Sequence, residues 1–137
     1  MASLTSANSL PRILVLEPDG LVRGTVSSVC RDLRLADVVQ TISCAAAARE
    51  LVDDSLAACI LSLAEGEAAM DLLRRLREGE FACPADMPVA LTATTVDGRT
   101  AGVLKELRIR RLLLKPFRIR DMVSTVESLL ATTAVGQ

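Results

Sequence analysis

The sequence predicts an α/β protein in which helices cover both faces of a five-stranded parallel sheet. Five short apolar runs alternate along the chain with five segments of helical character, and alternation of this kind is typical of parallel strands joined by right-handed crossovers. Half of the 137 residues are hydrophobic, but only two are aromatic, so the core must be aliphatic. A chain of this length is expected to form one domain with a sizeable core.

The first half of the chain contains three predicted strands and two predicted helices. Residues 12–17 form an apolar run that ends in a charge, as a buried parallel strand does, and Pro18-Asp19-Gly20 breaks it. Residues 21–33 carry a helical apolar stripe, and residues 37–42 are rich in β-branched side chains. Ser43 is a suitable cap for a helix over 44–52, and residues 57–63 form the third apolar run.

The second half begins with the clearest helix, residues 68–77, which has good helix formers throughout and one apolar stripe. Gly79 is expected to end this helix. The remaining elements are predicted at 88–93 (strand), 100–107 (helix), 111–114 (strand) and 118 to about 130 (helix). The domain is therefore predicted to span 12–131, with a disordered tail at 1–11 and a short tail at 132–137.

Composition excludes several classes of function. Cys30, Cys44, Cys59 and Cys83 form no CxxC spacing and the chain has no histidine, so we expect no zinc site, no other metal and no cofactor. The cysteines are predicted to be reduced, mostly buried thiols of a cytoplasmic protein. The apolar runs are too short and too interrupted by charges to cross a bilayer. No helix with base-reading polar residues stands out, so we do not expect DNA binding.

Five polar residues follow the predicted strands at their carboxyl ends, where parallel sheets bind ligands: Glu17, Asp19, Ser62, Thr92 and Lys115. Thr92-Ala93 after the fourth strand and Lys115-Pro116-Phe117 after the fifth resemble the receiver domains of bacterial two-component response regulators, as do the first strand and the helix that contains residues 72–77. The resemblance covers roughly 12–130. It implies the flavodoxin-like (βα)5 fold, the strand order two-one-three-four-five, and a cis bond between Lys115 and Pro116.

The departures from the receiver pattern predict a degenerate receiver. Receivers bind Mg²⁺ with an acidic pair after the first strand and accept a phosphoryl group on an aspartate after the third. The acidic pair corresponds here to Glu17 and Pro18, and the acceptor position falls on Ser62, or on Leu61 if the loop is one residue longer. Aspartyl phosphorylation needs a carboxylate nucleophile and a divalent ion. We therefore predict a pseudo-receiver that is not an enzyme.

The five strand-end residues are then expected to form a relic pocket without catalytic residues. Lys115 is predicted to pair with Glu17 or Asp19 in a collapsed, partly exposed pocket, where such a pair contributes roughly 0–1 kcal/mol. The hydroxyl of Thr92 is predicted to bond to the backbone.

Basic residues are concentrated near the end of the chain. Eight of the 16 Lys and Arg lie between Arg99 and Arg120, where Glu106 is the only acid, although the net charge is −1. We predict that five of them form the binding surface, together with the fourth helix, fifth strand and fifth helix: Arg108, Arg110, Arg111, Arg118 and Arg120.

Three functions remain open for this basic surface. The first is docking of a signalling protein without phosphorylation, on the surface that receivers usually present to partners. The second is binding of cyclic di-GMP, since guanidinium groups bind phosphate and residues 118–121 contain the pattern Arg-x-x-Asp. The third is a receiver phosphorylated at an atypical acceptor. A titration with cyclic di-GMP would separate the first two functions.

Overall fold

The computed structural model describes the backbone of residues 9–135 and the side chains of residues 9–131. Five strands alternate with helices in the order β1 (Arg12–Leu16), α2 (Gly20–Asp32), β2 (Asp37–Thr41), α3 (Cys44–Glu50), β3 (Leu56–Ser62), the short 3₁₀ helix η1 (Leu63–Glu65), α4 (Glu67–Arg77), β4 (Val89–Ala93), α5 (Gly98–Glu106), β5 (Arg111–Leu114) and α6 (Ile119–Val135). The predicted α/β class is therefore confirmed. Most of the predicted tail at 1–11 lies outside the described residues.

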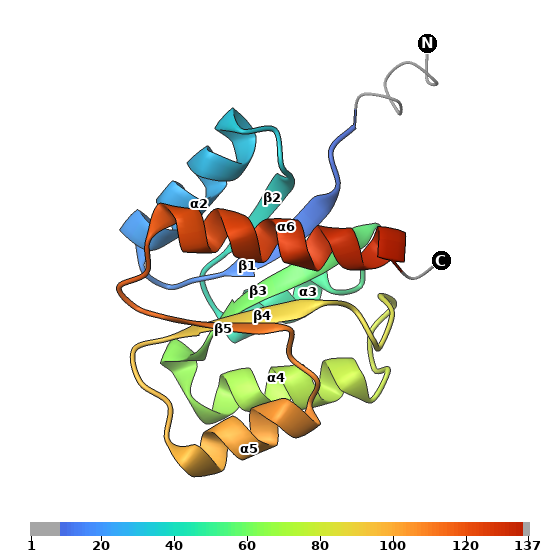
Figure 1. The fold of residues 1–137 in the computed structure, drawn as a ribbon. Helices are drawn as coiled ribbons and strands as arrows, with labels where there is room; N and C mark the ends of the chain where they lie inside the picture. Colours follow the sequence, from blue (N-terminus) through green and yellow to red (C-terminus); the bar gives the residue numbers. More distant parts are fainter. Residues whose placement is uncertain (1–8, 136–137) are drawn as a thin grey trace.

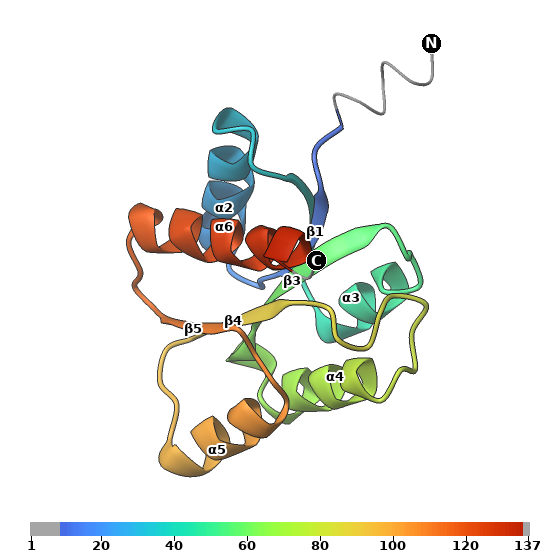
Figure 2. The ribbon, with the colours of Figure 1, turned by 45° about the vertical axis from the view of Figure 1, so that its right-hand side comes forward.

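The strands form one parallel sheet in the order β2-β1-β3-β4-β5, which confirms the order that the receiver resemblance implied. Helices α2 and α6 lie on one face of the sheet, and α3, α4 and α5 lie on the other (Figures 1 and 2). Side chains alternate between the two faces along each strand and so supply two aliphatic cores, one under each layer of helices. The molecule is a three-layer sandwich.

Two local features differ from the prediction. Helix α6 continues to Val135 instead of ending near Leu130. Residues 132–135 of the predicted C-terminal tail are thus helical in backbone, and residues 136–137 of that tail lie outside the described residues. The helix η1 was not predicted, and it forms because the Ser62 hydroxyl accepts a hydrogen bond from the Ala64 N–H at 3.1 Å. The predicted cap at Ser43 is confirmed, since its hydroxyl accepts from the Ala46 N–H.

The four cysteines are free thiols, three buried and one half-buried, as predicted. Burial raises the pKa of Cys30 to about 11. Burial also raises the pKa of Cys44 to about 11, with a further contribution from the neighbouring Glu65 carboxylate. These thiols therefore stay protonated at neutral pH and are poor nucleophiles. Within residues 9–135, no helix is long and apolar enough to span a membrane.

Two helices end on an arginine in the left-handed backbone region. Helix α4, by contrast, is followed by the glycine that is usual in this region, Gly79 at φ +78°. Arg34 (φ +55°) follows α2 and Arg108 (φ +59°) follows α5, and both are exposed. A side chain in this region costs about 1 kcal/mol relative to glycine. Both arginines therefore occupy positions that folding alone would give to glycine.

Arg77, at the end of α4, fastens two connections to that helix. Its guanidinium donates to the carbonyl oxygens of Ala85 (2.8 Å) and Met87 (2.7 Å), in the loop before β4. It also donates to the carbonyl oxygens of Leu107 (2.8 Å) and Arg108 (3.2 Å), between α5 and β5. Burial, and secondly repulsion from Arg108, lower the pKa of Arg77. One side chain thus holds the segments that precede β4 and β5.

Candidate functional site

Four of the predicted pocket residues lie on one face of the sheet at its carboxyl edge: Glu17, Ser62, Thr92 and Lys115. Each stands two residues after a member of the core under α2 and α6, namely Val15, Ile60, Ala90 and Leu113. The hydrogen bonding between strands continues one residue past the ends of β1 and β5, because the Glu17 N–H donates to the Thr41 carbonyl and the Lys115 N–H donates to the Ala93 carbonyl. Alternation therefore directs the four side chains to the α2/α6 side. The structure brings these predicted residues together.

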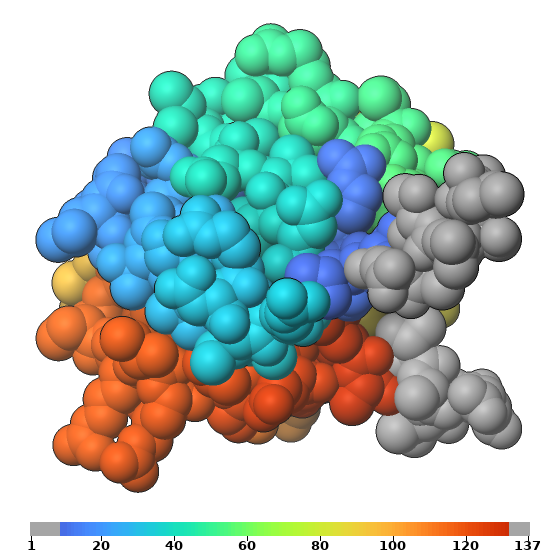
Figure 3. Space-filling model, turned by 90° about the horizontal axis from the view of Figure 1, so that it is seen from above, coloured from blue at the N-terminus to red at the C-terminus, as the bar shows by residue number. Residues whose placement is uncertain are grey.

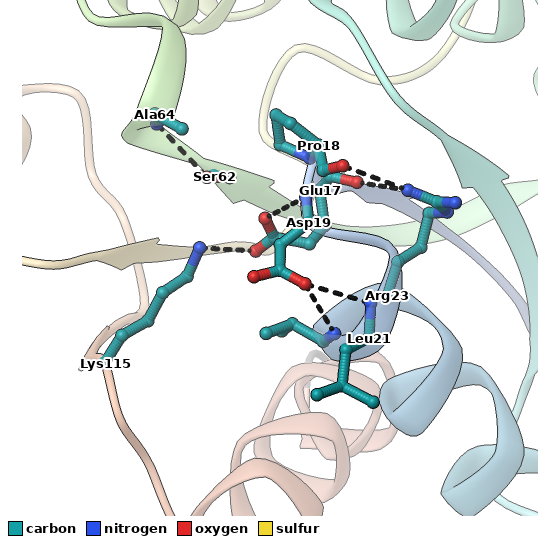
Figure 4. Close-up of polar contacts among 9 residues, drawn as sticks. Glu17, Pro18, Asp19, Leu21, Arg23, Ser62, Ala64 and Lys115 are labelled. Carbon is teal, nitrogen blue, oxygen red and sulfur yellow. Dashed lines mark hydrogen bonds and ion pairs between the residues drawn. The ribbon is translucent and has the colours of Figure 1, made fainter.

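The centre of this group is an ion pair between Lys115 and Glu17, 2.7 Å from Nζ to Oε1 (Figure 4). The predicted pairing of Lys115 is confirmed, and the cis bond before Pro116 is present. The predicted exposure is wrong for the carboxylate: the Glu17 side chain is only 4% exposed, against 20% for Lys115. The second carboxylate oxygen, Oε2, accepts from the Asp19 N–H at 3.0 Å. Both Glu17 oxygens thus have donors.

Asp19 takes no part in the ion pair and serves as the N-cap of α2. Its Oδ1 accepts from the N–H groups of Leu21 (2.9 Å) and Val22 (3.2 Å), as Figure 4 shows for Leu21. The same loop is braced by Arg23, which the sequence analysis missed. Its guanidinium donates to the carbonyl oxygens of Glu17 (2.8 Å) and Pro18 (3.4 Å). The loop between β1 and α2 is therefore closed by its own side chains.

The two hydroxyls of the group differ in their hydrogen bonds. Ser62 is buried and accepts from the Ala64 N–H, so its hydroxyl oxygen serves as a cap for η1. Thr92, its register partner on β4, is also buried, but its Oγ1 has no hydrogen-bond partner among the described residues. The prediction that the backbone satisfies Thr92 is therefore wrong. The side chain faces Glu17, Phe117 and Met122 in tight packing that leaves about 10 Å³.

Replacing Thr92 with valine is expected to leave stability unchanged or to raise the free energy of unfolding by about 1 kcal/mol, because it removes a buried polar atom that forms no hydrogen bond. The matched control is Thr41→Val. Thr41 is equally buried, but its hydroxyl donates to the Val15 carbonyl at 3.0 Å, so this variant should lose about 1 kcal/mol. Thermal unfolding measures both. Equal losses in the two variants would contradict the assignment.

Two cavities adjoin this edge of the sheet. One, of about 190 Å³, is lined by Ser62, Leu63, Ala64, Ala93, Thr94, Thr95 and Lys115. The other, of about 450 Å³, lies between the starts of α2 and α6 and is mostly apolar. Leu21 (81% exposed) and Ile119 (55% exposed) belong to its lining. The small cavity therefore has a mixed polar and apolar lining, the large one is an open and mostly apolar groove, and Lys115 lines both.

The five predicted binding arginines are all exposed, but they form two groups instead of one. Arg108, Arg110 and Arg111 lie at the amino end of β5, whereas Arg118 and Arg120 come after its carboxyl end. In the view from above, the segment that leads into α6 (orange) protrudes from one edge of the molecule (Figure 3). Arg111 and Arg118 therefore stand at opposite ends of β5.

The residues at the carboxyl edge do not fit the Mg²⁺ that the receiver resemblance implies. Magnesium is held through carboxylate oxygens. Pro18 offers no ligand, Glu17 is neutralised by Lys115, and Asp19 is engaged by the first turn of α2. Ser62 contributes only a neutral hydroxyl. Among the described residues, no group of three or more acidic, Cys or His side chains converges on one point.

Solved structures of receiver domains superpose on the fold of this chain. No protein-family model matches the sequence, and no curated protein matches it. A CheY-like receiver domain protein from Methanospirillum hungatei superposes with a TM-score of 0.82 at 12% identity, over 94% of this chain and 100% of that one. A response regulator receiver protein from Pseudomonas putida gives 0.77 at 20% identity, over 88% and 98%. A response regulator from Thermotoga maritima gives 0.72 at 20% identity, over 89% and 98%.

These three superpositions cover 88–94% of this chain. The chain therefore has the fold of the receiver domains of response regulators.

Proposed function

We propose that this domain is a phosphorylation-independent signalling module, which binds a partner protein through its α5–β5–α6 face and performs no catalysis. The observation that carries the proposal is the ion pair of Lys115 with the buried Glu17 carboxylate. The lysine that receivers use for the phosphoryl oxygens is already neutralised here. Ser62 stands at the acceptor position, and a serine without an adjacent base is a poor nucleophile. These features support binding without phosphoryl transfer.

The α5–β5–α6 face is supported as the binding surface by its charge. Half of the cationic residues lie between Arg99 and Arg120, and the five arginines named above are exposed. Exposed charges contribute little to folding, so their concentration supports a role in binding. The dinucleotide remains an alternative predicted from the sequence.

The proposal predicts that beryllofluoride with Mg²⁺ leaves the amide NMR spectrum unchanged. The carboxyl edge has no free carboxylate pair to hold the ion and no acidic acceptor for the phosphoryl analogue. A matched positive control is the double variant Pro18→Asp, Ser62→Asp, which adds two carboxylates beside Glu17 and should gain shifts with Mg²⁺. Saturable shifts at Glu17, Ser62 and Lys115 in the parent would overturn the proposal. Cyclic di-GMP is titrated in the same experiment.

A further inference from the structure

The connection between α5 and β5 is a rigid and strongly cationic segment. Arg108, Arg110 and Arg111 are exposed within four consecutive residues, and the exposed Lys105 precedes them by one helical turn. Glu106 is the only acid between Arg99 and Arg120. This positive charge is therefore concentrated at the amino end of β5.

The backbone of this connection is fixed on both sides. Arg77 donates from α4 to the carbonyl oxygens of Leu107 and Arg108. The Arg110 N–H donates to the Val89 carbonyl at 2.7 Å, and Ile109 packs against the core under α4 and α5. The cationic side chains therefore project from a backbone that is ordered before any partner arrives, which lowers the cost of binding.

The shape of the surface favours a macromolecule over a small ligand. The arginines of this connection line neither of the two cavities at the carboxyl edge, which lie at the opposite end of the sheet. Dinucleotides and other small ligands bind in concave sites, whereas protein segments bind across open surfaces. Arg77 and Arg108 also repel one another, and an incoming carboxylate would relieve this repulsion.

We infer that the connection formed by residues 107–111 is the part of the α5–β5–α6 face that binds the partner, and that the partner presents an acidic protein segment to it. This inference rests on the proposed function and adds to it the end of β5 that is used and the chemistry of the partner. Arg108 contacts the acidic segment, and Arg110 and Arg111 extend the contact along the start of β5. Arg118 and Arg120 are not needed.

The backbone conformation of Arg108 provides a test in which the stability of the protein and its affinity for the partner should change in opposite directions. The variant Arg108→Gly relieves the left-handed strain and should raise the melting temperature by about 3 °C. The same variant removes a charge from the surface and should weaken binding of a fluorescein-labelled polyglutamate peptide about tenfold at low salt. A loss of binding in a more stable protein cannot be attributed to unfolding.

Arg34→Gly is the matched control. Arg34 has the same left-handed backbone and is exposed, but it follows α2, next to a surface where Arg31 pairs with Asp32. This variant should gain the same stability and bind polyglutamate as the parent does. The double variant Arg118→Ala, Arg120→Ala should also bind as the parent does.

Several results would overturn the inference. These are a parent that does not bind the peptide, an Arg108→Gly variant that binds as the parent does, or an Arg34→Gly variant that weakens binding equally. Tighter binding of a duplex oligonucleotide than of polyglutamate would also contradict an acidic protein partner. A loss confined to the Arg118/Arg120 variant would refute the inference and keep the proposed function. Failure of the proposed function itself is read separately, from the titration with beryllofluoride and Mg²⁺.

Discussion

Replacing Arg77 with methionine is expected to lower the free energy of unfolding by about 3 kcal/mol or more. Four carbonyl oxygens, on two separate connections, receive hydrogen bonds from this guanidinium. Methionine keeps the apolar stem but donates nothing. Three of the four hydrogen bonds are part-buried, and an acceptor left there without a donor costs about 1–3 kcal/mol, less where water reaches it. Because the chain has no Trp or Tyr, urea unfolding followed by far-ultraviolet circular dichroism is the suitable measurement.

The control for this variant is Arg75→Met, in the same turn of α4. Arg75 lies 5.0 Å from the centre of the Phe81 ring and 3.2 Å from Glu80, but its side chain is 40% exposed. Contacts of this kind contribute about 1 kcal/mol or less. If Arg77→Met and Arg75→Met lowered the free energy of unfolding equally, the hydrogen bonds of Arg77 would not account for the loss.

Replacing Lys115 with methionine is expected to lower the free energy of unfolding by about 3 kcal/mol, because it leaves the buried Glu17 carboxylate without its counter-charge. The double variant Glu17→Gln, Lys115→Met should recover most of this loss. In this double variant the neutral Gln side chain still offers an oxygen to the Asp19 N–H, which donates to Glu17 in the parent. Equilibrium unfolding of both single variants and the double variant measures the coupling, expected at about 2 kcal/mol. Additive losses would mean that the pair has no coupling.

The fold could be predicted from the sequence because local and global signals agree. Short aliphatic runs between amphipathic segments permit little except a parallel sheet with helices on both faces, and Ser43 and Gly79 mark helix ends as expected. The errors lie where the signal is weak. No glycine or proline separates Leu130 from Val135, so nothing in the sequence marked an earlier end of α6. The helix η1 depends on one side-chain hydrogen bond.

The candidate site could be predicted only as far as strand ends and alternation determine it. These placed Glu17, Ser62, Thr92 and Lys115 at one edge, but burial and hydrogen bonds depend on how α2 and α6 pack over them. Arginines close in sequence were expected to be close in space, which a strand between them prevents. Arg77 was missed, although it stands four residues after the buried Leu73. An arginine that continues an apolar stripe is a usable signal of a half-buried guanidinium.

Helix α5 is attached to the rest of the sandwich much less firmly than α4. It buries one side chain, Leu104, whereas α4 buries five, and it contains Gly98 and Gly102. Burial of one leucine contributes about 1.5–3 kcal/mol, while ordering each residue costs about 1–2 kcal/mol. Much of the attachment of α5 is therefore at its C-terminal end, through Arg77. Local unfolding of α5 should need only a small part of the global free energy, so α5 exchanges its amide hydrogens before α4 does. The backbone of the α5–β5–α6 face is thus held in place at the start of β5, whereas the neighbouring helix α5 unfolds locally at a low free energy.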